Sequence, residues 1–311
     1  MERRRLGALD VSVVGLGCNN FGMRISAAEA KSVVDAAIAA GINYFDTAES
    51  YGEGRSEQFL GAAVAGRRDE VLLATKWGGR GSPDRPGSPA AVRAALEASL
   101  RRLGTDRVDH YQLHRPDADT PIADTLGALA ELRAEGKIRE IGCSNFSAEQ
   151  LDDAASVASQ LGVPMFASVQ NHYSLLTRTA EHDGVLDACA RHGIAFVPYF
   201  PLESGVLTGK YRPGEPPPEG TRLAAWGDRA AGFLGDERLA KVAALTEWAS
   251  SAGHTILDLA MSWLTSNQQV ASVICGATAP DQIRANVAAA QWPLTADDRV
   301  AVDVVLDAVR A

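Results

Sequence analysis

Eight short apolar runs alternate along this chain with longer, Ala-rich segments that have helical spacing. Such alternation is typical of repeated strand and helix units around a parallel sheet. The predicted strands are 13–17, 43–46, 71–76, 110–114, 138–143, 167–170, 195–199 and 271–275. Eight such units in 311 residues predict one (β/α)8 TIM barrel domain spanning residues 1–311.

The segments between the strands predict helices and functional loops. Helices are expected at 27–40, 90–103, 122–135, 149–159, 185–191, 236–252 and 281–290. Ser26, Ser88 and Ser147 precede three of them and are expected to cap them with side-chain oxygens. We also expect an N-terminal capping hairpin and long loops at the C-terminal face. The stretch 211–220 (YRPGEPPPEG) predicts a mobile loop after the seventh strand, suitably placed for a lid.

A doubly wound open sheet is the alternative for eight strands, but no GxGxxG turn joins a first strand to a helix. The barrel is therefore preferred.

Composition limits the environment and the partners. The chain is 46% hydrophobic and 22% charged with a net charge of -9, which is unsuited to binding nucleic acid or anionic lipid. Its four cysteines are scattered without CxxC spacing, which argues against a zinc site and a disulfide framework. The sequence has neither a signal-peptide pattern nor the ~20 apolar residues that span a bilayer. We expect a cytoplasmic protein without metal, and a monomer by default.

Four polar side chains lie at or just after the ends of predicted strands, namely Asp46, Tyr51, Lys76 and His114. Singly, each has an ordinary explanation: a helix cap, a packed aromatic, a solvated charge and a histidine bonded to a carbonyl. Together they can deliver a proton to a carbonyl oxygen. An ammonium lowers the pKa of a phenol from about 10, a carboxylate holds the ammonium, and an imidazole orients the carbonyl.

These residues stand in the contexts FDTAESYG, ATKWG and YQLHRPD, in which the chain resembles the aldo-keto reductase family. The resemblance extends from GLGCNNFG (15–22) to GATAPDQIRAN (276–286). It implies reduction of an aldehyde or ketone by hydride transfer from a nicotinamide cofactor. Tyr51 would be the proton donor, Lys76 would modulate its pKa, Asp46 would hold Lys76, and His114 would orient the substrate.

The same resemblance implies a cofactor site. Ser144, Asn145 and Gln170 match the groups that bind the carboxamide, and Tyr199 matches the aromatic that stacks on the nicotinamide. In the loop that crosses the pyrophosphate, the matching residues are Leu202, Gly205, Leu207 and Lys210. Arg222 matches the family arginine that swings over the cofactor. At the adenosine end, the matching residues are Gly276, Thr278, Gln282 and Asn286.

The chain departs from some relatives at the adenosine end. Gly276 and Ala277 stand where these relatives carry Lys and Ser, Gln282 stands in place of an Arg, and Ala285 replaces a common Glu. Because Arg222 and Lys210 can still supply positive charge to the 2′-phosphate, we predict NADPH over NADH, with only moderate discrimination.

The substrate pocket is predicted as an aromatic-lined cleft made by Asn19, Phe21, Trp77, Phe146 and Trp226, although each is as readily explained by ordinary packing. Two other functions remain open. One is a redox-coupled, nicotinamide-binding regulatory protein similar to the potassium-channel β subunits. The other is a barrel lyase or isomerase using acid and base alone, which would not need Ser144, Asn145 and Gln170 together.

Overall fold

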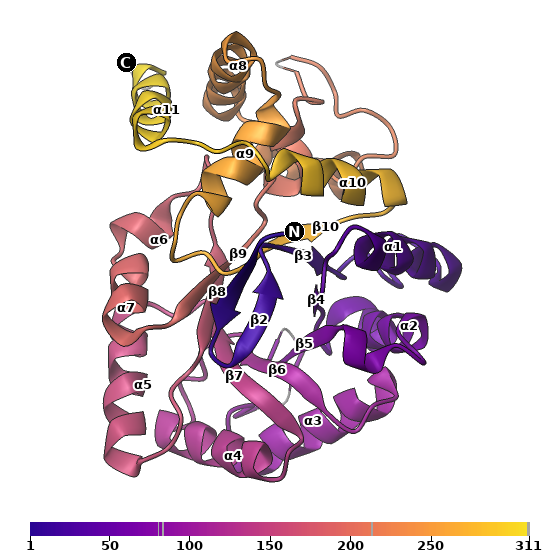
Figure 1. Ribbon diagram of the computed structural model, residues 1–311, viewed down its shortest axis with the longest axis vertical. Helices are drawn as coiled ribbons and strands as arrows, with labels where there is room; N and C mark the ends of the chain where they lie inside the picture. The colour runs from indigo at the N-terminus through magenta and orange to yellow at the C-terminus, as the bar shows by residue number, and fades with distance from the viewer. Residues whose placement is uncertain (80, 83, 213, 310–311) are drawn as a thin grey trace.

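Eight parallel strands form the centre of the molecule in the computed structural model, which describes residues 1–79, 81–82, 84–212 and 214–309. Their order around the sheet is β10-β3-β4-β5-β6-β7-β8-β9. Their bounds are β3 (Val14–Gly17), β4 (Tyr44–Asp46), β5 (Leu72–Trp77), β6 (Val108–Leu113), β7 (Ile138–Ser144), β8 (Ser168–His172), β9 (Ala195–Tyr199) and β10 (Val273–Gly276). Helices surround these strands (Figure 1). The prediction of an (β/α)8 barrel is confirmed.

The barrel closes between β9 and β10. β10 pairs in parallel with β3 along its full length, whereas β9 meets the segment before β10 through a single parallel bridge between Phe196 and Val270. The Phe196 N–H donates to the Gln269 carbonyl at 2.8 Å, and the Phe196 carbonyl accepts from the Ala271 N–H at 2.9 Å. These bonds satisfy backbone groups that an open sheet edge would expose.

The helices between the strands are α1 (Ala27–Ala39), α2 (Arg55–Ala63), α3 (Pro89–Leu103), α4 (Ile122–Ala134), α5 (Ala148–Leu161), α6 (Thr179–His182), α7 (Val185–His192), α8 (Asp236–Ser251), α9 (Ile256–Thr265), α10 (Pro280–Ala289) and α11 (Ala296–Ala308). Four 3₁₀ segments are described: η1 (Tyr51–Gly54), η2 (Arg68–Glu70), η3 (Glu203–Thr208) and η4 (Ala224–Phe233). α2, α6, α9 and α11 lie outside the predicted helices. α9 is buried on nearly every side, so its apolar residues show no helical stripe.

The helix starts confirm two of the three predicted caps. The hydroxyls of Ser26 and Ser147 accept from the backbone N–H three residues later, and both form capping boxes. Ser88 is the N-cap residue of α3, but its side chain makes no cap hydrogen bond. That expectation was wrong for Ser88. Pro89 follows at the first helical position, where its fixed φ favours helix entry without a side-chain cap.

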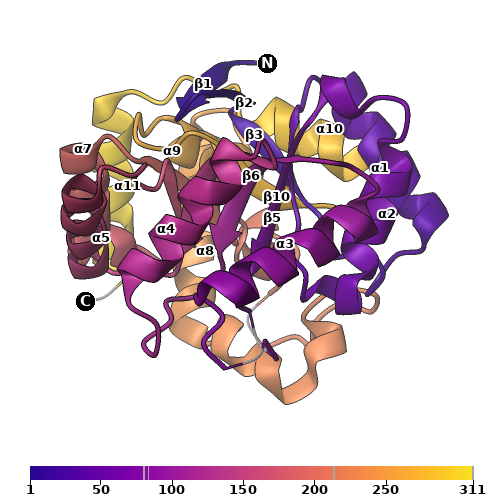
Figure 2. The same ribbon diagram turned by 90° about the horizontal axis from the view of Figure 1, so that it is seen from below.

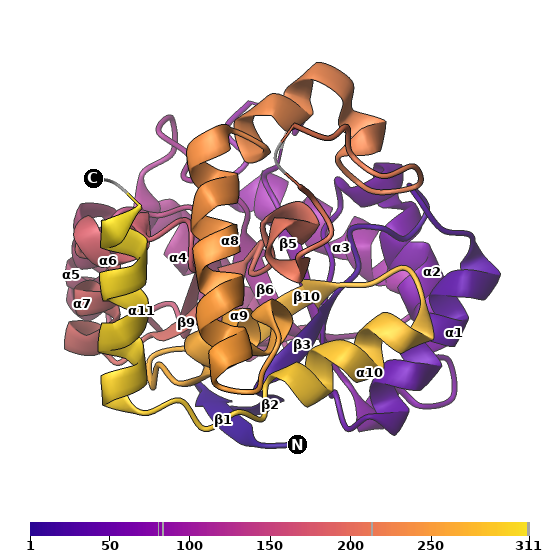
Figure 3. The same cartoon turned by 90° about the horizontal axis from the view of Figure 1, so that it is seen from above.

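An antiparallel hairpin of β1 (Arg3–Leu6) and β2 (Leu9–Ser12) covers one end of the barrel, as predicted. Leu6, Leu9 and Val11 pack there against the inward side chains of Tyr44 and Val197. Figures 2 and 3 show this hairpin at one end and the orange segment after β9 at the opposite end. The hairpin therefore closes the N-terminal end and leaves the C-terminal ends of the strands open for a site.

A polar layer lies inside the barrel near that hairpin. The fully buried His110 imidazole contacts the Tyr44 hydroxyl through Nδ1 at 2.7 Å and the Ser168 hydroxyl through Nε2 at 3.0 Å. Gly142 provides the room, because a Cβ at this position would lie 2.4 Å from His110 Nε2. Burial lowers the pKa of His110 to about 3, so this imidazole is neutral near pH 7.

Candidate active site

Asp46, Tyr51, Lys76 and His114 meet at the C-terminal ends of three neighbouring strands. Asp46 ends β4, Lys76 lies in β5, and His114 follows β6 by one residue instead of closing it as expected. Tyr51 begins η1, in the loop after β4. Because parallel strands of a barrel end at one rim, residues distant in the sequence converge there.

The carboxylate of Asp46 and the ammonium of Lys76 form a buried ion pair, with Asp46 Oδ2 and Lys76 Nζ 2.5 Å apart. Two side-chain amides also donate to Asp46 Oδ1, those of Gln112 at 3.1 Å and Gln170 at 3.2 Å. Lys76 donates further to the Thr47 carbonyl at 3.0 Å. Burial by itself lowers the pKa of Lys76, but the charges of Asp46 and Tyr51 outweigh it, and that pKa is raised. Lys76 therefore stays an ammonium.

Tyr51 lies next to this ammonium, with Lys76 Nζ 5.4 Å from the centre of its ring. Burial raises the pKa of the Tyr51 phenol and Lys76 lowers it, and burial prevails. Lys76 thus lowers this pKa as expected, but the net shift is upward because the phenolate loses more hydration than one ammonium replaces. Tyr51 is a neutral proton donor at pH 7.

His114 packs edge-on against Tyr51, with their ring centres 5.8 Å apart. Burial and the charge of Lys76 lower the pKa of His114 to about 3, so its imidazole is neutral. Its Nδ1 atom is buried without a hydrogen-bond partner among the described residues. A neutral imidazole beside a phenol can donate one hydrogen bond to a carbonyl oxygen without competing for the phenol proton.

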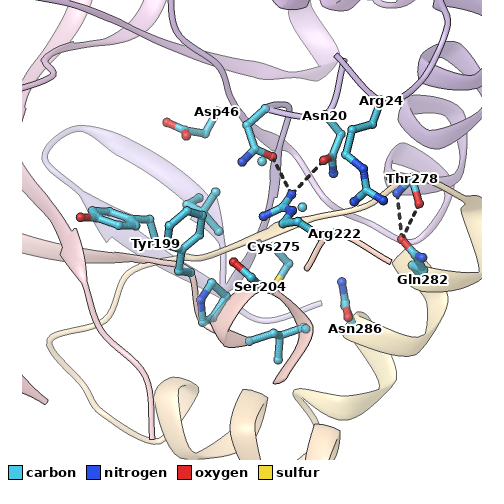
Figure 4. Close-up of a pocket in the computed structure, with 18 of the residues that line it drawn as sticks. Asn20, Arg24, Asp46, Tyr199, Ser204, Arg222, Cys275, Thr278, Gln282 and Asn286 are labelled. Carbon is cyan, nitrogen blue, oxygen red and sulfur yellow. Dashed lines mark hydrogen bonds between the residues drawn. The ribbon is translucent and has the colours of Figure 1, made fainter. Parts of the chain in front are cut away.

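A cavity of about 790 Å³ opens beside these residues. Figure 4 shows Asp46 and Tyr199 on one side of it and Arg24, Thr278 and Gln282 on the other. The predicted site residues that line it are Asp46, Tyr51, His114, Ser144, Asn145, Gln170, Tyr199, Leu202, Gly205, Lys210, Arg222, Gly276, Thr278, Gln282 and Asn286. Lys76 and Leu207 are buried behind the wall.

The expected aromatic-lined cleft is not formed in this cavity. Phe21, Trp77 and Phe146 are buried in the hydrophobic core, and Trp77 stacks on Tyr111 with ring centres 4.3 Å apart. Trp226 packs edge-on against Phe233. Of the five predicted residues, Asn19 lines the cavity. The aromatic rings of the other four residues are used for packing, which was the alternative explanation given for them from the sequence.

Three of the predicted amide and hydroxyl groups are held by bonds among themselves. Ser144 Oγ donates to the Gln170 carbonyl at 2.7 Å, and Asn145 Nδ2 donates to Ser144 Oγ at 3.1 Å and to the His114 carbonyl at 2.9 Å. The Tyr199 hydroxyl donates to Asn145 Oδ1 at 2.8 Å, and the ring of Tyr199 stacks on His172. This network fixes one wall of the cavity and leaves a second lone pair on Asn145 Oδ1.

The wall after β9 is a strained turn anchored by one buried carboxylate. Phe200, Glu203 and Ser204 have positive φ angles of 53°, 47° and 57°, which are costly for residues other than glycine. Glu203 is fully buried and accepts from Arg238 Nη2 at 2.6 Å and from Ser174 Oγ, and it contacts His172 Nε2 at 2.9 Å. Ser204 Oγ lines the cavity and has no partner among the described residues.

Three cations line the cavity close enough to affect one another, namely Arg24, Lys210 and Arg222, and Figure 4 shows Arg222 between Asp46 and Thr278. Among the described residues, none of them forms an ion pair with a carboxylate. Burial and mutual repulsion lower the pKa values of Lys210 and Arg222. Arg222 Nη2 donates to Asn20 Oδ1 at 2.8 Å, and a Cβ on Gly276 would lie 3.6 Å from that same nitrogen. That distance is an ordinary van der Waals contact, whereas the same Cβ would lie 3.2 Å from Asn19 Oδ1, so the missing side chain at Gly276 makes room for Asn19.

The predicted lid segment borders the cavity at its end. Within the described part of 211–220 there is no helix or strand, and Pro213 lies outside the described residues. Arg24 Nη2 donates to the Gly220 carbonyl at 3.0 Å, which joins this segment to the loop after β3. The mobility of the segment and its role as a lid stay predictions.

Several site residues were missed by sequence reasoning. Arg24, Asn20 and Arg115 line the cavity, while His172 and Glu203 support its wall. Arg115 stands inside the quoted motif YQLHRPD, and Arg24 stands two residues after GLGCNNFG, so their positive charge was the available signal. Glu203 gave no signal, because a carboxylate in a polar loop normally faces solvent.

A barrel with a phenol, an ammonium, a carboxylate and an imidazole at the mouth of a long cavity is equipped for proton transfer to a bound carbonyl compound. The family model described as "Aldo/keto reductase family" matches residues 13–307, so the chain belongs to this family. Members of this family are oxidoreductases that generally use a nicotinamide cofactor and act on small carbonyl compounds.

Individual relatives cover most of the chain. A probable voltage-gated potassium channel subunit beta from Oryza sativa subsp. japonica is 37% identical over 93% of this chain and 91% of its own length. Protein tas from Escherichia coli (strain K12) is 32% identical over 96% of this chain and 95% of its own length. L-glyceraldehyde 3-phosphate reductase from the same strain is 31% identical over 93% of this chain and 87% of its own length. In the part of the chain that the structure describes, no helix is long and apolar enough to cross a membrane.

Proposed function

We propose that the protein reduces an aldehyde or ketone to the alcohol with NADPH, and that Tyr51 supplies the proton. The observation that carries this proposal is the Asp46, Lys76, Tyr51 and His114 cluster beside a cavity of about 790 Å³. The similarity to L-glyceraldehyde 3-phosphate reductase supports a small carbonyl substrate.

The cavity fits a nicotinamide dinucleotide. Ser204 Oγ is a polar atom in its wall without a partner among the described residues, and Arg24, Lys210 and Arg222 line it without an ion pair to any described carboxylate. Ser144, Asn145 and Gln170 would hold the carboxamide, Tyr199 would stack on the ring, and Thr278, Gln282 and Asn286 would contact the adenosine end. When bound, the reduced nicotinamide supplies hydride to the carbonyl carbon.

The residues around Tyr51 manage the proton. Tyr51 donates its hydroxyl proton to the oxygen that gains negative charge, and Lys76 lowers the cost of the resulting phenolate. Asp46 keeps Lys76 charged and in place through their 2.5 Å contact. Neutral His114 donates a hydrogen bond that orients the carbonyl. The raised pKa of Tyr51 keeps the phenol protonated and ready across the neutral range.

A preference for NADPH over NADH is supported by the three cations. The 2′-phosphate adds a dianionic group, and charge-assisted contacts from guanidinium groups favour it. Arg24 adds to the Arg222 and Lys210 that the sequence suggested, and it compensates for the small side chains at Gly276 and Ala277.

Tyr51→Phe tests the proposal, because it removes only the transferable proton. We expect carbonyl turnover to fall by about 10²-fold or more, while NADPH binding measured by fluorescence stays within about twofold of wild type. Near-normal turnover in the variant would remove Tyr51 from the role of proton donor. If wild type binds no nicotinamide nucleotide, the whole proposal fails.

The similarity to the potassium channel subunit beta favours a second candidate, a regulatory protein whose bound nicotinamide reports redox state. Steady-state turnover separates the two functions. Repeated reduction of a generic aldehyde with excess NADPH supports the enzyme, whereas one slow oxidation per bound cofactor supports the regulatory protein.

A further inference from the structure

Arg115 is a charged residue at the reacting end of the cavity that the mechanism above does not use. It follows His114 at the end of β6, lines the cavity, and is exposed. Its positive charge acts on the groups around the carbonyl position: it contributes to lowering the pKa of His114 and opposes the burial that raises the pKa of Tyr199. Arg115 therefore belongs to the substrate end.

The other charged or titratable groups that line the cavity at this end are neutral or neutralised. Asp46 and Lys76 neutralise each other through their buried ion pair. Tyr51 and Tyr199 are neutral phenols because burial raises their pKa values, and His114 is a neutral imidazole. The guanidinium of Arg115 thus leaves the substrate end with one net positive charge, in a chain whose net charge of -9 repels anions at long range.

No carboxylate of the described residues neutralises Arg115 by an ion pair. Asp117, two residues further on, is occupied in its own loop, where its carboxylate accepts from the Gly87 N–H at 2.8 Å and the Asp119 N–H at 3.0 Å. The phosphate-binding function proposed above uses Arg24, Lys210 and Arg222 and leaves Arg115 unassigned. Arg115 therefore has a free guanidinium, whose planar donors suit a carboxylate or phosphate.

We propose that Arg115 binds an anionic group on the substrate, so that the protein acts on aldehydes or ketones carrying a carboxylate or a phosphate. This inference rests on the proposed carbonyl reduction and names the substrate class of the same site. Arg115 here determines specificity and takes no part in proton or hydride transfer.

Matched pairs of aldehydes test the inference, because each pair differs chiefly in one charge. The carboxylate pair is 4-carboxybenzaldehyde and its neutral methyl ester, and the phosphate pair is 4-formylphenyl phosphate and neutral 4-methoxybenzaldehyde. We expect wild type to favour the anion in at least one pair by about tenfold in kcat/KM, and Arg115→Gln to remove most of that ratio. Arg115→Lys, which keeps the charge but loses the planar fork, should retain part of it.

Two controls separate the effect of Arg115 from a general loss of structure or charge. Each anion is compared with its neutral partner in the same variant, so that any general effect of Arg115→Gln on the site, including its effect on His114, cancels in the ratio. Arg101→Gln makes the same charge change in the last turn of α3, away from the cavity, and should leave every ratio unchanged. The responding pair identifies the anion as carboxylate or phosphate.

A binding measurement distinguishes failure of this inference from failure of the proposed function. Calorimetry on the complex with NADP⁺ gives the Kd of each aldehyde without turnover. The inference would be overturned if wild type bound and reduced the anion and its neutral partner equally well, or if Arg115→Gln left the ratio between them unchanged. Reduction of the neutral ester would in that case still support the proposed enzyme. Tighter anion binding that depends on Arg115, without reduction of any aldehyde, would uphold anion recognition and overturn the reductase.

Discussion

At the scale of single residues, the site depends on charges that are balanced inside the barrel. Lys76 is fully buried, yet its contact with Asp46 and proximity to Tyr51 hold it as an ammonium. Removing one member of such a pair costs stability as well as activity, since a lone buried charge is poorly solvated. Variants at this site therefore need a control for folding.

Lys76→Met should abolish turnover, because the phenolate left after proton donation loses its only adjacent cation among the described residues. The change also leaves Asp46 buried without its ion-pair partner, which costs about 3–5 kcal/mol in the free energy of unfolding. We expect the double variant Lys76→Met/Asp46→Asn to recover most of this stability in urea titrations while turnover stays lost. An active single variant with an unchanged pH profile would contradict the coupling between Lys76 and Tyr51.

The cation cluster sets a second prediction at this scale. Arg24→Gln and Arg222→Ala should each reduce the NADPH to NADH preference in Kd by roughly tenfold, which corresponds to about 1.4 kcal/mol per contact. The change should come from weaker NADPH binding, with NADH nearly unaffected. Fluorescence titrations of both cofactors measure it, with Arg101→Gln as a control outside the cavity. Equal cofactor use by wild type, or a ratio that neither variant changes, would mean that these arginines do not bind the 2′-phosphate.

Sequence reasoning recovered the residues whose position follows from strand ends and missed those whose role follows from packing. The convergence of Asp46 and Lys76 was predictable because both lie at the C-terminal ends of neighbouring strands. The direction of the pKa shift of Tyr51 was not predictable, because its desolvation depends on neighbours that only the folded chain brings together. Likewise, Trp77 has the same sequence context whether it faces a pocket or, as found, stacks on Tyr111.

At the scale of elements, β9 and the turn after it show how a loop becomes a rigid wall. Arg238 of α8 and Ser174, which follows β8, meet the carboxylate of Glu203. These contacts hold Phe200, Glu203 and Ser204 in a left-handed conformation. The sequence predicts a strand before this turn and a helix after it, but the anchor between them depends on a tertiary contact.

Glu203→Gln should weaken both the fold and cofactor binding, because it removes the charge that holds the strained turn. We expect the free energy of unfolding to fall by about 3–5 kcal/mol, as for other broken buried ion pairs. The Kd for NADPH should rise by roughly tenfold, with a smaller change in the KM for the carbonyl substrate. Arg93→Met, which breaks an exposed ion pair with Glu135, is the control and should cost about 1 kcal/mol or less. Loss of stability with an unchanged Kd would show that Glu203 supports the fold without shaping the cofactor wall.

At the scale of the whole molecule, the barrel is closed at one end by the hairpin of β1 and β2 and carries its site at the other. Between the two ends the interior contains polar residues as well as apolar ones: His110 lies in the layer near the hairpin, and His114 lies at the site. Both imidazoles are neutral inside the fold, so their protonation is linked to unfolding of the entire barrel.

This linkage predicts that stability falls on mild acidification. The pKa of each of these two histidines is about 3 in the folded protein, against the ordinary value of 6.5 that an unfolded chain would have. The contribution of the two neutral histidines to stability is fully present above pH 6.5. Between pH 6.5 and 3 the unfolded chain binds more protons than the folded protein, so this contribution is lost as the pH falls. Each histidine then removes up to about 1.4 kcal/mol of unfolding free energy per pH unit.

Urea titrations between pH 7 and 5 measure this effect, because most carboxylates remain ionised in that range. Wild type should lose stability progressively as the pH falls. His110→Gln should show a clearly shallower slope, whatever its stability at pH 7, since one of the two buried imidazoles is gone. His254→Gln is the matched control, because His254 is partly exposed and has no comparable burial. A wild-type stability that is constant from pH 7 to 5, or a slope that His110→Gln leaves unchanged, would show that His110 is not held neutral by the fold.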